Sequence, residues 1–489
     1  MSKYDLIDLT INEKKLANAI RRAKERGIII PTYAQMKNPS LIPNEIKEAL
    51  KTVGLTDLNP LNLFRTNWHN EPKDTGGLFG EGNYVVLPKE ITGVDAKIVA
   101  ISGKYFPTGS HKVGAAISCL APRLVTGQFD PISTKAVWPS TGNYCRGGAY
   151  VSTLLACESI AILPEGMSRE RFDWLETVAG QTIATPGTES NVKEIFDKCW
   201  ELRNSGEDLM IFNQFDEFGN YLWHHEVTGS FIEEILNKVG GNYKGYVSST
   251  GSGGTLAAGD YLKTIYPTSK VIAAEALQCP TIYMNGFGEH RIEGIGDKHI
   301  PWVHNVKNTD AVAAIDDEIP MNMIRLFNEP EGKKLLKSQG VSDEILNKLQ
   351  WAGISGCGNI ASAIKMAKYF ELKEDDVIVT VLTDSMDMYE SRLKEMTENH
   401  GEFTALEAYR VYHQYLQGIN TEYFKELNYQ ERKAVHNLKY YTWVEQQGKT
   451  YEEICAQWDD EDYWTSIPKK IKDLDKLINS FNDAVKKLK

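Results

Sequence analysis

Lys112 ends the segment Pro107-Thr108-Gly109-Ser110-His111-Lys112, and its position in the sequence suits a reactive amine. The apolar, β-branched residues 96–102 before it predict a strand, and residues 111–125 predict a helix that Ser110 can cap. Because a helix start attracts anions, a charged lysine is disfavoured in the first turn. We therefore consider Lys112 a candidate neutral nucleophile of the kind that forms Schiff bases, against the alternative of an ordinary solvated surface lysine.

Three other polar segments also follow predicted strands. They are Ser140-Thr141-Gly142-Asn143, Gly251-Ser252-Gly253-Gly254-Thr255 and Thr383-Asp384-Ser385. Open α/β sheets bind their ligands at the carboxyl ends of their strands, so these segments and Lys112 are expected at one sheet edge. An amine, a polar loop, a glycine-rich anion site and a hydroxyl group at one edge together suit pyridoxal 5'-phosphate as cofactor.

The glycine-rich loop is the candidate phosphate site. Its glycines let the backbone approach a ligand, and amide groups at a helix start attract an anion, which assigns Gly251, Ser252, Gly253, Gly254 and Thr255 to cofactor binding. A dinucleotide fingerprint is a rival interpretation, because Glu275 ends the next predicted strand. That fingerprint needs a third glycine where the chain has Leu256. A plain tight turn is the remaining alternative.

The other two segments predict contacts with a ring and a carboxylate. Ser140, Thr141 and Asn143 could bind a carboxylate and a ring hydroxyl, although the same four residues also make a good helix cap. Ser385 is expected to face the pyridine nitrogen, with Asp384 and Thr383 as alternatives. A hydroxyl partner does not hold that nitrogen protonated as a carboxylate would, which favours loss of a β-substituent over transamination.

Short apolar strands and helical segments alternate along the middle of the chain. Strands are expected at 96–102, 134–138, 158–163, 181–185, 209–213, 244–249, 270–275 and 377–382, and helices at 111–125, 142–157, 166–178, 189–204, 220–238 and 254–265. Uninterrupted apolar strands indicate sheets covered on both faces. The pattern predicts an α/β fold of mostly parallel sheets covered by helices.

This core is expected to be flanked on both sides. We predict an N-terminal arm at 1–95, a core of two lobes at 96–395 with a small lobe of about 130–215 inserted, and a helical C-terminal extension at 396–489. The extension carries many tyrosines and tryptophans at helical spacing, which are typical of packing. We expect it to cover the core or form a dimer surface rather than bind a regulator.

The composition narrows the class of protein. The chain has 489 residues, of which 42% are hydrophobic and 25% charged, and its formal net charge is −12. An acidic chain is not expected to bind nucleic acid or a membrane surface. Seven scattered cysteines without a C-x-x-C pair predict a reducing, cytoplasmic setting and no structural metal.

With these segments in hand, residues 96–391 resemble the fold type II (tryptophan synthase β-like) family of pyridoxal-phosphate enzymes, and look most like cysteine synthase and cystathionine β-synthase. The motifs come in family order: Lys112; Ser140 to Asn143; Pro164 to Ser168 with Arg171; Ala184 to Gly187; Asn213 to Phe215 with His225; Gly251 to Thr255; His290 to Gly296; Gly353 to Gly356; and Thr383 to Ser385 with Tyr389.

The resemblance implies roles for individual residues. Lys112 would hold the cofactor as a Schiff base and act as general base, and Asn143 and Ser385 would contact its ring. Ser140, Thr141, Gly142 and Gly294 would bind the substrate. The implied reaction is β-replacement or β-elimination on cysteine, serine or an O-activated serine through an aminoacrylate, with closure of the small lobe excluding water. A homodimer is also implied.

Some features depart from the family pattern and leave alternatives. His111 precedes the lysine where cysteine synthases carry an apolar residue, and Tyr144-Cys145 replaces small residues. No haem-binding segment or tandem regulatory module is recognisable. A serine or threonine dehydratase and a non-catalytic, cofactor-binding or interaction protein are the alternative functions. We expect His111, His224, His225 and His290 to make structural hydrogen bonds, and Cys145 to be a buried small hydrophobe.

Overall fold

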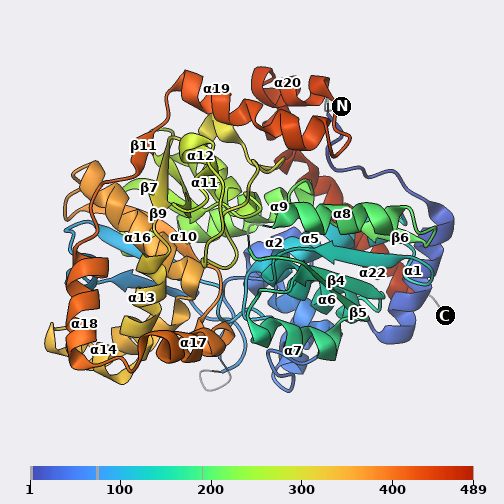
Figure 1. The fold of residues 1–489 in the computed structure, drawn as a ribbon. Coiled ribbons are helices and arrows are strands. Elements are labelled where there is room, and N and C mark those ends of the chain that lie inside the picture. The colour runs from blue at the N-terminus through green and yellow to red at the C-terminus, as the bar shows by residue number, and fades with distance from the viewer. Residues whose placement is uncertain (1–3, 73–75, 190, 488–489) are drawn as a thin grey trace.

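Two sheets form two lobes in the computed structural model, which describes residues 4–72, 76–189 and 191–487 (Figure 1). The large sheet has seven strands in the order β1-β2-β10-β7-β8-β9-β11, and the small sheet has four in the order β5-β4-β3-β6. The strands are β1 (Tyr84–Leu87), β2 (Lys97–Ser102), β3 (Lys135–Pro139), β4 (Ser159–Pro164), β5 (Gln181–Thr185), β6 (Leu209–Ile211), β7 (Asn242–Ser249), β8 (Lys270–Ala276), β9 (Ala311–Ile315), β10 (Asp376–Leu382) and β11 (Phe424–Glu426).

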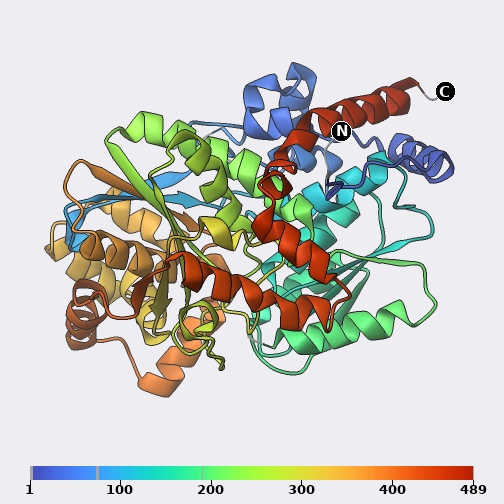
Figure 2. The same cartoon turned by 90° about the horizontal axis from the view of Figure 1, so that it is seen from above.

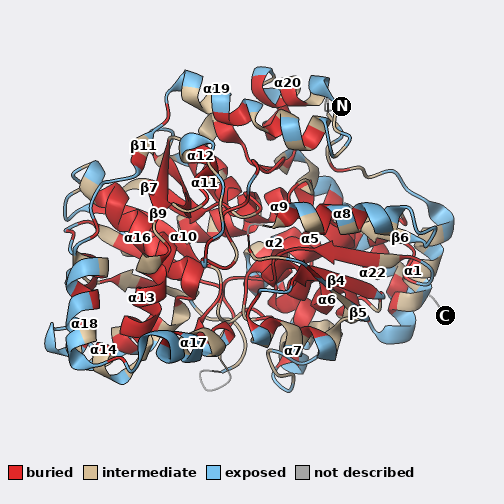
Figure 3. Ribbon diagram, viewed as in Figure 1, coloured by how far each residue is buried: buried red, intermediate tan, exposed pale blue. Residues whose placement is uncertain are grey.

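Both sheets are mostly parallel, as the alternating pattern predicted. Strands β2, β10, β7, β8 and β9 run parallel to one another, and so do all four strands of the small sheet. Helices cover both faces, so the strands of the large sheet are buried almost throughout (Figure 3). This double covering explains why the strands appear in the sequence as short apolar runs without polar alternation.

Helices connect and cover these strands. Those around the site are α5 (Lys112–Val125), α6 (Asn143–Leu154), α7 (Arg169–Val178), α8 (Val192–Arg203), α9 (Phe218–Trp223), α10 (Gly229–Val239), α11 (Ala257–Ile265), α16 (Ile354–Tyr369) and α17 (Glu390–His400). The helix expected at 220–238 is in fact interrupted, because a π-helical turn at His224–Thr228 separates α9 from α10. At Gly229 a Cβ would lie 2.6 Å from the Tyr261 ring, so close packing needs glycine there.

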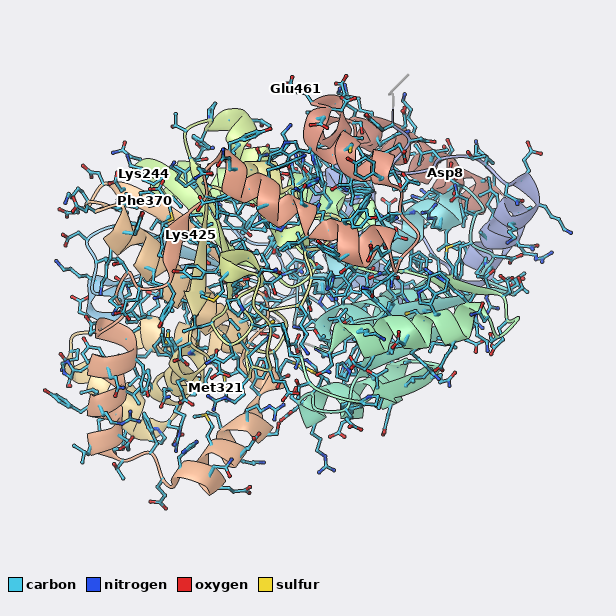
Figure 4. All side chains as sticks on the ribbon, turned by 45° about the horizontal axis from the view of Figure 1, so that its top comes forward. Asp8, Lys244, Met321, Phe370, Lys425 and Glu461 are labelled. Atoms are coloured by element: carbon cyan, nitrogen blue, oxygen red, sulfur yellow. The ribbon has the colours of Figure 1, made fainter. Side chains whose placement is uncertain are left out.

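The segments outside the core each add a strand to the large sheet. β1 pairs antiparallel with β2, and β11, from the C-terminal extension, pairs antiparallel with β9. The extension is therefore not purely helical. Figure 4 shows Lys425 of β11 near Phe370, whose ring lies 5.8 Å from that of Phe424.

The rest of the extension crosses from one lobe to the other. Helices α19 (Tyr429–Asn437) and α20 (Tyr451–Asp459) pass over the top of the molecule, and α22 (Ile471–Lys487) packs against α1 (Glu13–Arg26) and α5 (Figures 1 and 2). Asn482 of α22 bonds the backbone of Ile30 in both directions, at 2.8 and 3.0 Å. Within the described residues, no helix has the length and apolar character needed to span a membrane.

Candidate active site

Lys112 is the first residue of α5 and is buried at the carboxyl edge of the large sheet. Its Nζ donates hydrogen bonds to Gln214 Oε1 at 3.2 Å and to Ser252 Oγ at 3.0 Å. His111, not Ser110, occupies the N-cap position, and the Ser110 hydroxyl instead accepts a bond from the Lys112 amide. The first turn of α5 therefore aims the lysine at the glycine-rich loop.

The surroundings of Lys112 favour its neutral form. Burial lowers the pKa of Lys112 to about 8, although the acidic Asp297 and Glu189 oppose the shift. Burial also holds the pKa of His111 well below its ordinary value, and Lys112 adds to that effect. At pH 7 about a tenth of the amine is then neutral and can act as a nucleophile or a base, far more than for an ordinary lysine.

The glycine-rich loop leaves β7 and leads into α11. Gly253 has a φ of +73°, a conformation that favours glycine. At Gly251 an added Cβ would lie 2.5 Å from the Gly294 carbonyl oxygen. The Ser252 hydroxyl accepts a hydrogen bond from Asn220 Nδ2 at 3.0 Å, and Thr255 accepts one from Ser248 at 2.8 Å. Close backbone packing and hydroxyl bonds together fix the shape of this loop.

Asn143 and the loop after β10 meet across the two lobes. Asn143 Nδ2 donates to Asp384 Oδ2 at 2.7 Å, and Asn143 Oδ1 is buried without a partner among the described residues. The Ser385 hydroxyl is likewise buried and unpartnered within the described chain. Thr383, by contrast, bonds the His111 ring at 3.3 Å. Two orphaned polar atoms at one sheet edge are the state expected of groups that await a ligand.

One pocket collects many of the residues predicted from the sequence. Of these it is lined by Lys112, Ser140, Thr141, Asn143, Gly251, Ser252, Thr255 and Gly294. The predicted residues that do not line it are Gly142, Gly253, Gly254 and Ser385. Further lining residues to which the sequence gave no role include Gln214, Asp297 and Asn359. Gln214 lies within the motif Asn213 to Phe215, but no role was assigned to it. Asp297 and Asn359 lie outside the motifs, so only their position in the fold reveals them.

Arg171 of α7 joins the small lobe to the large one. Its fully buried guanidinium pairs with Glu293 and donates to the Tyr389 hydroxyl at 2.9 Å. The Tyr389 hydroxyl in turn donates to Asp384 Oδ2 at 2.7 Å. The neighbouring Glu170 accepts from the amide and the hydroxyl of Ser391 at 2.8 and 2.7 Å. This interlobe network ends on Asp384, the carboxylate that orients Asn143.

The candidate histidines make local hydrogen bonds, as expected. His224 bonds Thr228 at 3.0 Å, His225 bonds Glu226 at 3.1 Å and His290 bonds the Gly296 carbonyl at 3.0 Å. Cys145 is buried, and burial raises the pKa of its thiol to about 11, which disfavours the nucleophilic thiolate.

Glu275 lies outside this site and has a structural task. Its carboxylate accepts from the amides of Ile282 and Tyr283 at 2.9 and 2.8 Å. A carboxylate engaged in this way is unavailable to a ribose, so the dinucleotide interpretation has no support here.

The polar groups of the site match those needed to bind pyridoxal phosphate. A buried lysine amine lies beside a glycine-rich loop at a helix start, and unpartnered Asn143 Oδ1 and Ser385 Oγ lie across from it. The amine would react with the aldehyde carbon of the cofactor, and the loop would bind its phosphate. The polar groups would contact its substituted pyridine ring.

Comparison with known proteins agrees. The family described as pyridoxal-phosphate dependent enzyme matches residues 104–384, more than half of the chain. The chain belongs to this family, and its cofactor is pyridoxal 5'-phosphate.

Two curated relatives show the range of similarity. The chain is 29% identical over 313 residues to a cysteine synthase of Staphylococcus aureus, covering 63% of this chain and 92% of the relative. It is 26% identical over 313 residues to cystathionine beta-synthase of Saccharomyces cerevisiae, covering 62% of this chain and 58% of the relative.

Solved structures share the fold. A hydrogen sulfide-producing enzyme from Fusobacterium nucleatum superposes with a TM-score of 0.54 at 24% identity, covering 63% of this chain and 95% of that one. An O-acetylserine dependent cystathionine beta-synthase from Helicobacter pylori gives 0.52 at 25% identity, covering 63% and 94%. The predicted fold class of two mostly parallel sheets is thus confirmed.

Proposed function

We propose that this enzyme catalyses β-replacement or β-elimination on a β-substituted amino acid: cysteine, serine or an O-activated serine. The observation that carries the proposal is the buried Lys112 amine, bonded to Ser252 of the glycine-rich loop in a pocket lined by Ser140 and Thr141. The relatives named cysteine synthase and cystathionine beta-synthase support the same class of reaction.

We assign roles to the predicted residues on chemical grounds. Gly251, Ser252, Gly253, Gly254 and Thr255 would hold the cofactor phosphate, and Asn143 and Ser385 would contact the ring. Ser140, Thr141, Gly142 and Gly294 would hold the substrate. The bound cofactor supplies an electron sink for negative charge at the substrate α-carbon. Since the pKa of Lys112 is about 8, its amine is suited to accept the α-proton near neutral pH.

Arg171 and α7 would exclude water from this chemistry. The buried Arg171–Glu293 pair and the Glu170–Ser391 hydrogen bonds hold the small lobe against the large one. A closed site favours addition of a nucleophile at the β-carbon over hydrolysis of the elimination product to pyruvate and ammonia. Opening and closing of this contact would admit the amino acid and release the product.

The assembly and setting are also proposals. We expect a core at 96–395 with a small lobe at about 130–215, flanked by 1–95 and 396–489, working as a homodimer in the cytoplasm. Seven free cysteines, six of them buried, support a reducing compartment.

The test is product analysis with three amino acids. Purified protein with pyridoxal phosphate is given cysteine, serine or O-acetylserine, alone and with a thiol, and sulfide, pyruvate and thioether products are measured. We expect product from at least one substrate, lost in Lys112→Ala and retained in the matched variant Lys193→Ala, whose side chain is exposed. Pyruvate alone from serine would indicate the dehydratase. No turnover and no cofactor absorbance would contradict the proposal and favour a non-catalytic protein.

A further inference from the structure

A second cavity lies apart from the catalytic pocket, where three parts of the chain meet. It has a volume of about 280 Å³, near the lower limit of small-molecule sites. The first turns of α8, which packs on the small sheet, form one wall. Lys298 and His299 of the large lobe form a second wall, and Thr442 and Gln446 of the C-terminal extension form a third. The chemistry described above gives this cavity no role.

The N-terminus of α8 opens on the cavity without a side-chain cap. Asn191 occupies the N-cap position but makes no capping bond, and its Oδ1 atom instead accepts from the Thr188 amide at 3.0 Å. Val192, Lys193 and Glu194, the first three residues of this 12-residue helix, all line the cavity. Uncapped amide groups at a helix start attract an anion.

The charged side chains around the cavity are of both signs. Lys298 is exposed and has no ion pair within the described part of the chain, whereas Lys193 is paired with Asp197. Glu194 Oε1 accepts from Asn191 Nδ2 at 3.2 Å, but Glu194 Oε2 is buried without a partner among the described residues. The cavity therefore offers an ammonium group and a helix start to an anion, and a carboxylate oxygen to a cation.

The remaining walls are neutral. His299 is 9% exposed, and its Nε2 atom has no hydrogen-bond partner within the described chain. Burial lowers the pKa of His299 to about 3, so the ring carries no charge near neutral pH. Val192 and Phe196 add apolar surface. Unpartnered polar atoms on two different walls are the state expected of groups that await a ligand.

We propose that this cavity is a receptor for an α-amino acid with an apolar side chain, which acts as an effector. The carboxylate would bind the start of α8 and Lys298, the ammonium group would bind Glu194, and the side chain would lie against Phe196. A simple anion such as phosphate would leave Glu194 unpaired beside a like charge. The receptor goes beyond the proposed function, and only its effect on the rate rests on that function.

Aromatic rings connect the cavity to the catalytic pocket. The His299 ring, which lines the cavity, has its centre 4.9 Å from that of Phe215, which lines the catalytic pocket. The Phe196 ring lies 5.8 Å from Phe215. Gln214, the neighbour of Phe215, accepts from Lys112 Nζ at 3.2 Å. A ligand in the cavity would thus contact the outer side of the rings that pack beside the lysine, and would touch both lobes.

The first test measures binding without catalysis. Borohydride reduction of the cofactor-loaded protein fixes the cofactor to its lysine, so an amino acid cannot exchange with it. Calorimetric titration then compares L-leucine with 4-methylpentanoate, which lacks the ammonium group, with 3-methylbutylamine, which lacks the carboxylate, and with inorganic phosphate. We expect saturable binding of leucine and at least about tenfold weaker binding of the other three. Absent leucine binding, or equal binding of any of the three, would overturn the receptor.

Substitutions locate the leucine site. Glu194→Gln and Lys298→Met should each weaken leucine binding at least about tenfold. Glu201→Gln, on an exposed position of the same helix, and the exposed Lys334→Met are the matched controls and should bind as the wild type does. Because Lys298 is exposed, its replacement tests the receptor even if Glu194→Gln disturbs the start of α8. Unchanged affinity in Lys298→Met would place leucine elsewhere and contradict the proposal.

The second test measures the effect on the rate. With the best β-substituted amino acid, L-leucine should lower kcat at least about twofold without raising KM, because a ligand that touches both lobes favours their closed arrangement. Lys298→Met should remove this inhibition. A rise in KM alone would mark competition in the catalytic pocket and overturn the effector, as would bound leucine without any effect on the rate. Leucine binding in a protein without turnover would contradict the proposed reaction and keep the receptor.

Discussion

Lys112 and Lys439 are both buried in this protein, and their surroundings differ in the number of hydrogen-bond acceptors around the amine. Lys439 of the C-terminal extension donates to the carbonyl oxygens of Trp302 and His304 and to Gln457 Oε1, at 3.0, 2.7 and 2.7 Å. Its amine also lies over the Trp302 and Trp464 rings. Lys112 has two polar partners and faces a pocket. Burial lowers the pKa of both amines.

The difference separates an anchoring lysine from a reactive one. Three acceptors match the three N–H groups of an ammonium ion, so the protons of Lys439 are all engaged and the side chain is fixed. Lys112 keeps one direction free, toward a pocket of hydroxyl groups and glycines. Both residues have a lowered pKa, so the pKa does not distinguish them. The unoccupied hydrogen-bonding direction of Lys112, which faces the pocket, is what indicates a catalytic role.

The largest expected effect is on catalysis. Lys112→Ala should lower kcat/KM by about 10⁴-fold, because it removes both the attachment point and the base. Lys439→Ala should keep the visible absorbance of the bound cofactor. Steady-state kinetics with the substrate identified above, together with absorbance spectra, measures both. If Lys439→Ala lost the cofactor while Lys112→Ala retained it, the comparison would be reversed.

The stability of the fold, unlike catalysis, should depend on Lys439. Lys439→Met removes one donor from each of two buried carbonyl oxygens and the donor of Gln457 Oε1, and should reduce the free energy of unfolding by about 2 kcal/mol. The carbonyl oxygens of Trp302 and His304 keep the Gln457 side chain and the Val306 amide as donors. The exposed Lys469→Met is the control and should not change it measurably. Urea unfolding followed by circular dichroism provides the measurement. A loss as small as that of the control would show that Lys439 is not an anchor.

The pH dependence of cofactor uptake sharpens the account of Lys112. Only the neutral amine attacks an aldehyde, and the pKa of Lys112 lies at about 8. The uptake rate of cofactor-free protein should therefore rise about tenfold per pH unit below 8 and level off above it. An ordinary lysine pKa would keep the rate rising to much higher pH. Stopped-flow absorbance between pH 6.5 and 9.5 distinguishes these profiles, and a plateau absent at pH 9 would contradict the lowered pKa.

The smallest effect concerns the partner of Lys112 in the glycine-rich loop. Ser252→Ala removes one neutral hydroxyl acceptor, worth about 1 kcal/mol, and should weaken cofactor binding about fivefold. Its fold stability should stay close to that of the wild type, since Asn220 keeps a bond to the Gln214 carbonyl at 2.9 Å. Titration of the cofactor-free protein with pyridoxal phosphate, followed by fluorescence, measures the affinity. An unchanged affinity would remove Ser252 from the site.

The sequence predicted the parallel core because buried strands must be short and apolar there. It missed β1 and β11, since strands of four and three residues at sheet edges carry no distinct pattern. It also missed the buried strand β9, whose five residues include three alanines and therefore have little strand propensity. It also missed the π-helical turn at His224–Thr228, because the apolar spacing continues through it.

Within the site, motifs were predictable and isolated residues were not. Lys112 and the glycine-rich loop were predictable because each directly follows a predicted strand. Asp297 and Asn359 line the site through tertiary packing alone. Gln214 lies in the motif Asn213 to Phe215, which did not predict its bond to Lys112. The sequence left Thr383 and Ser385 as alternatives. Thr383 lines the pocket and bonds His111, whereas the Ser385 hydroxyl is buried and unpartnered. The ring contact of Ser385 stays a prediction.

The central claim is that Lys112, and no other lysine, carries the cofactor. Borohydride reduction of the cofactor-loaded protein makes the lysine attachment permanent, and peptide mass mapping then identifies the modified residue. The account predicts one major modified peptide, containing Lys112. Modification of Lys439 or of exposed lysines, with Lys112 unmodified, would contradict it.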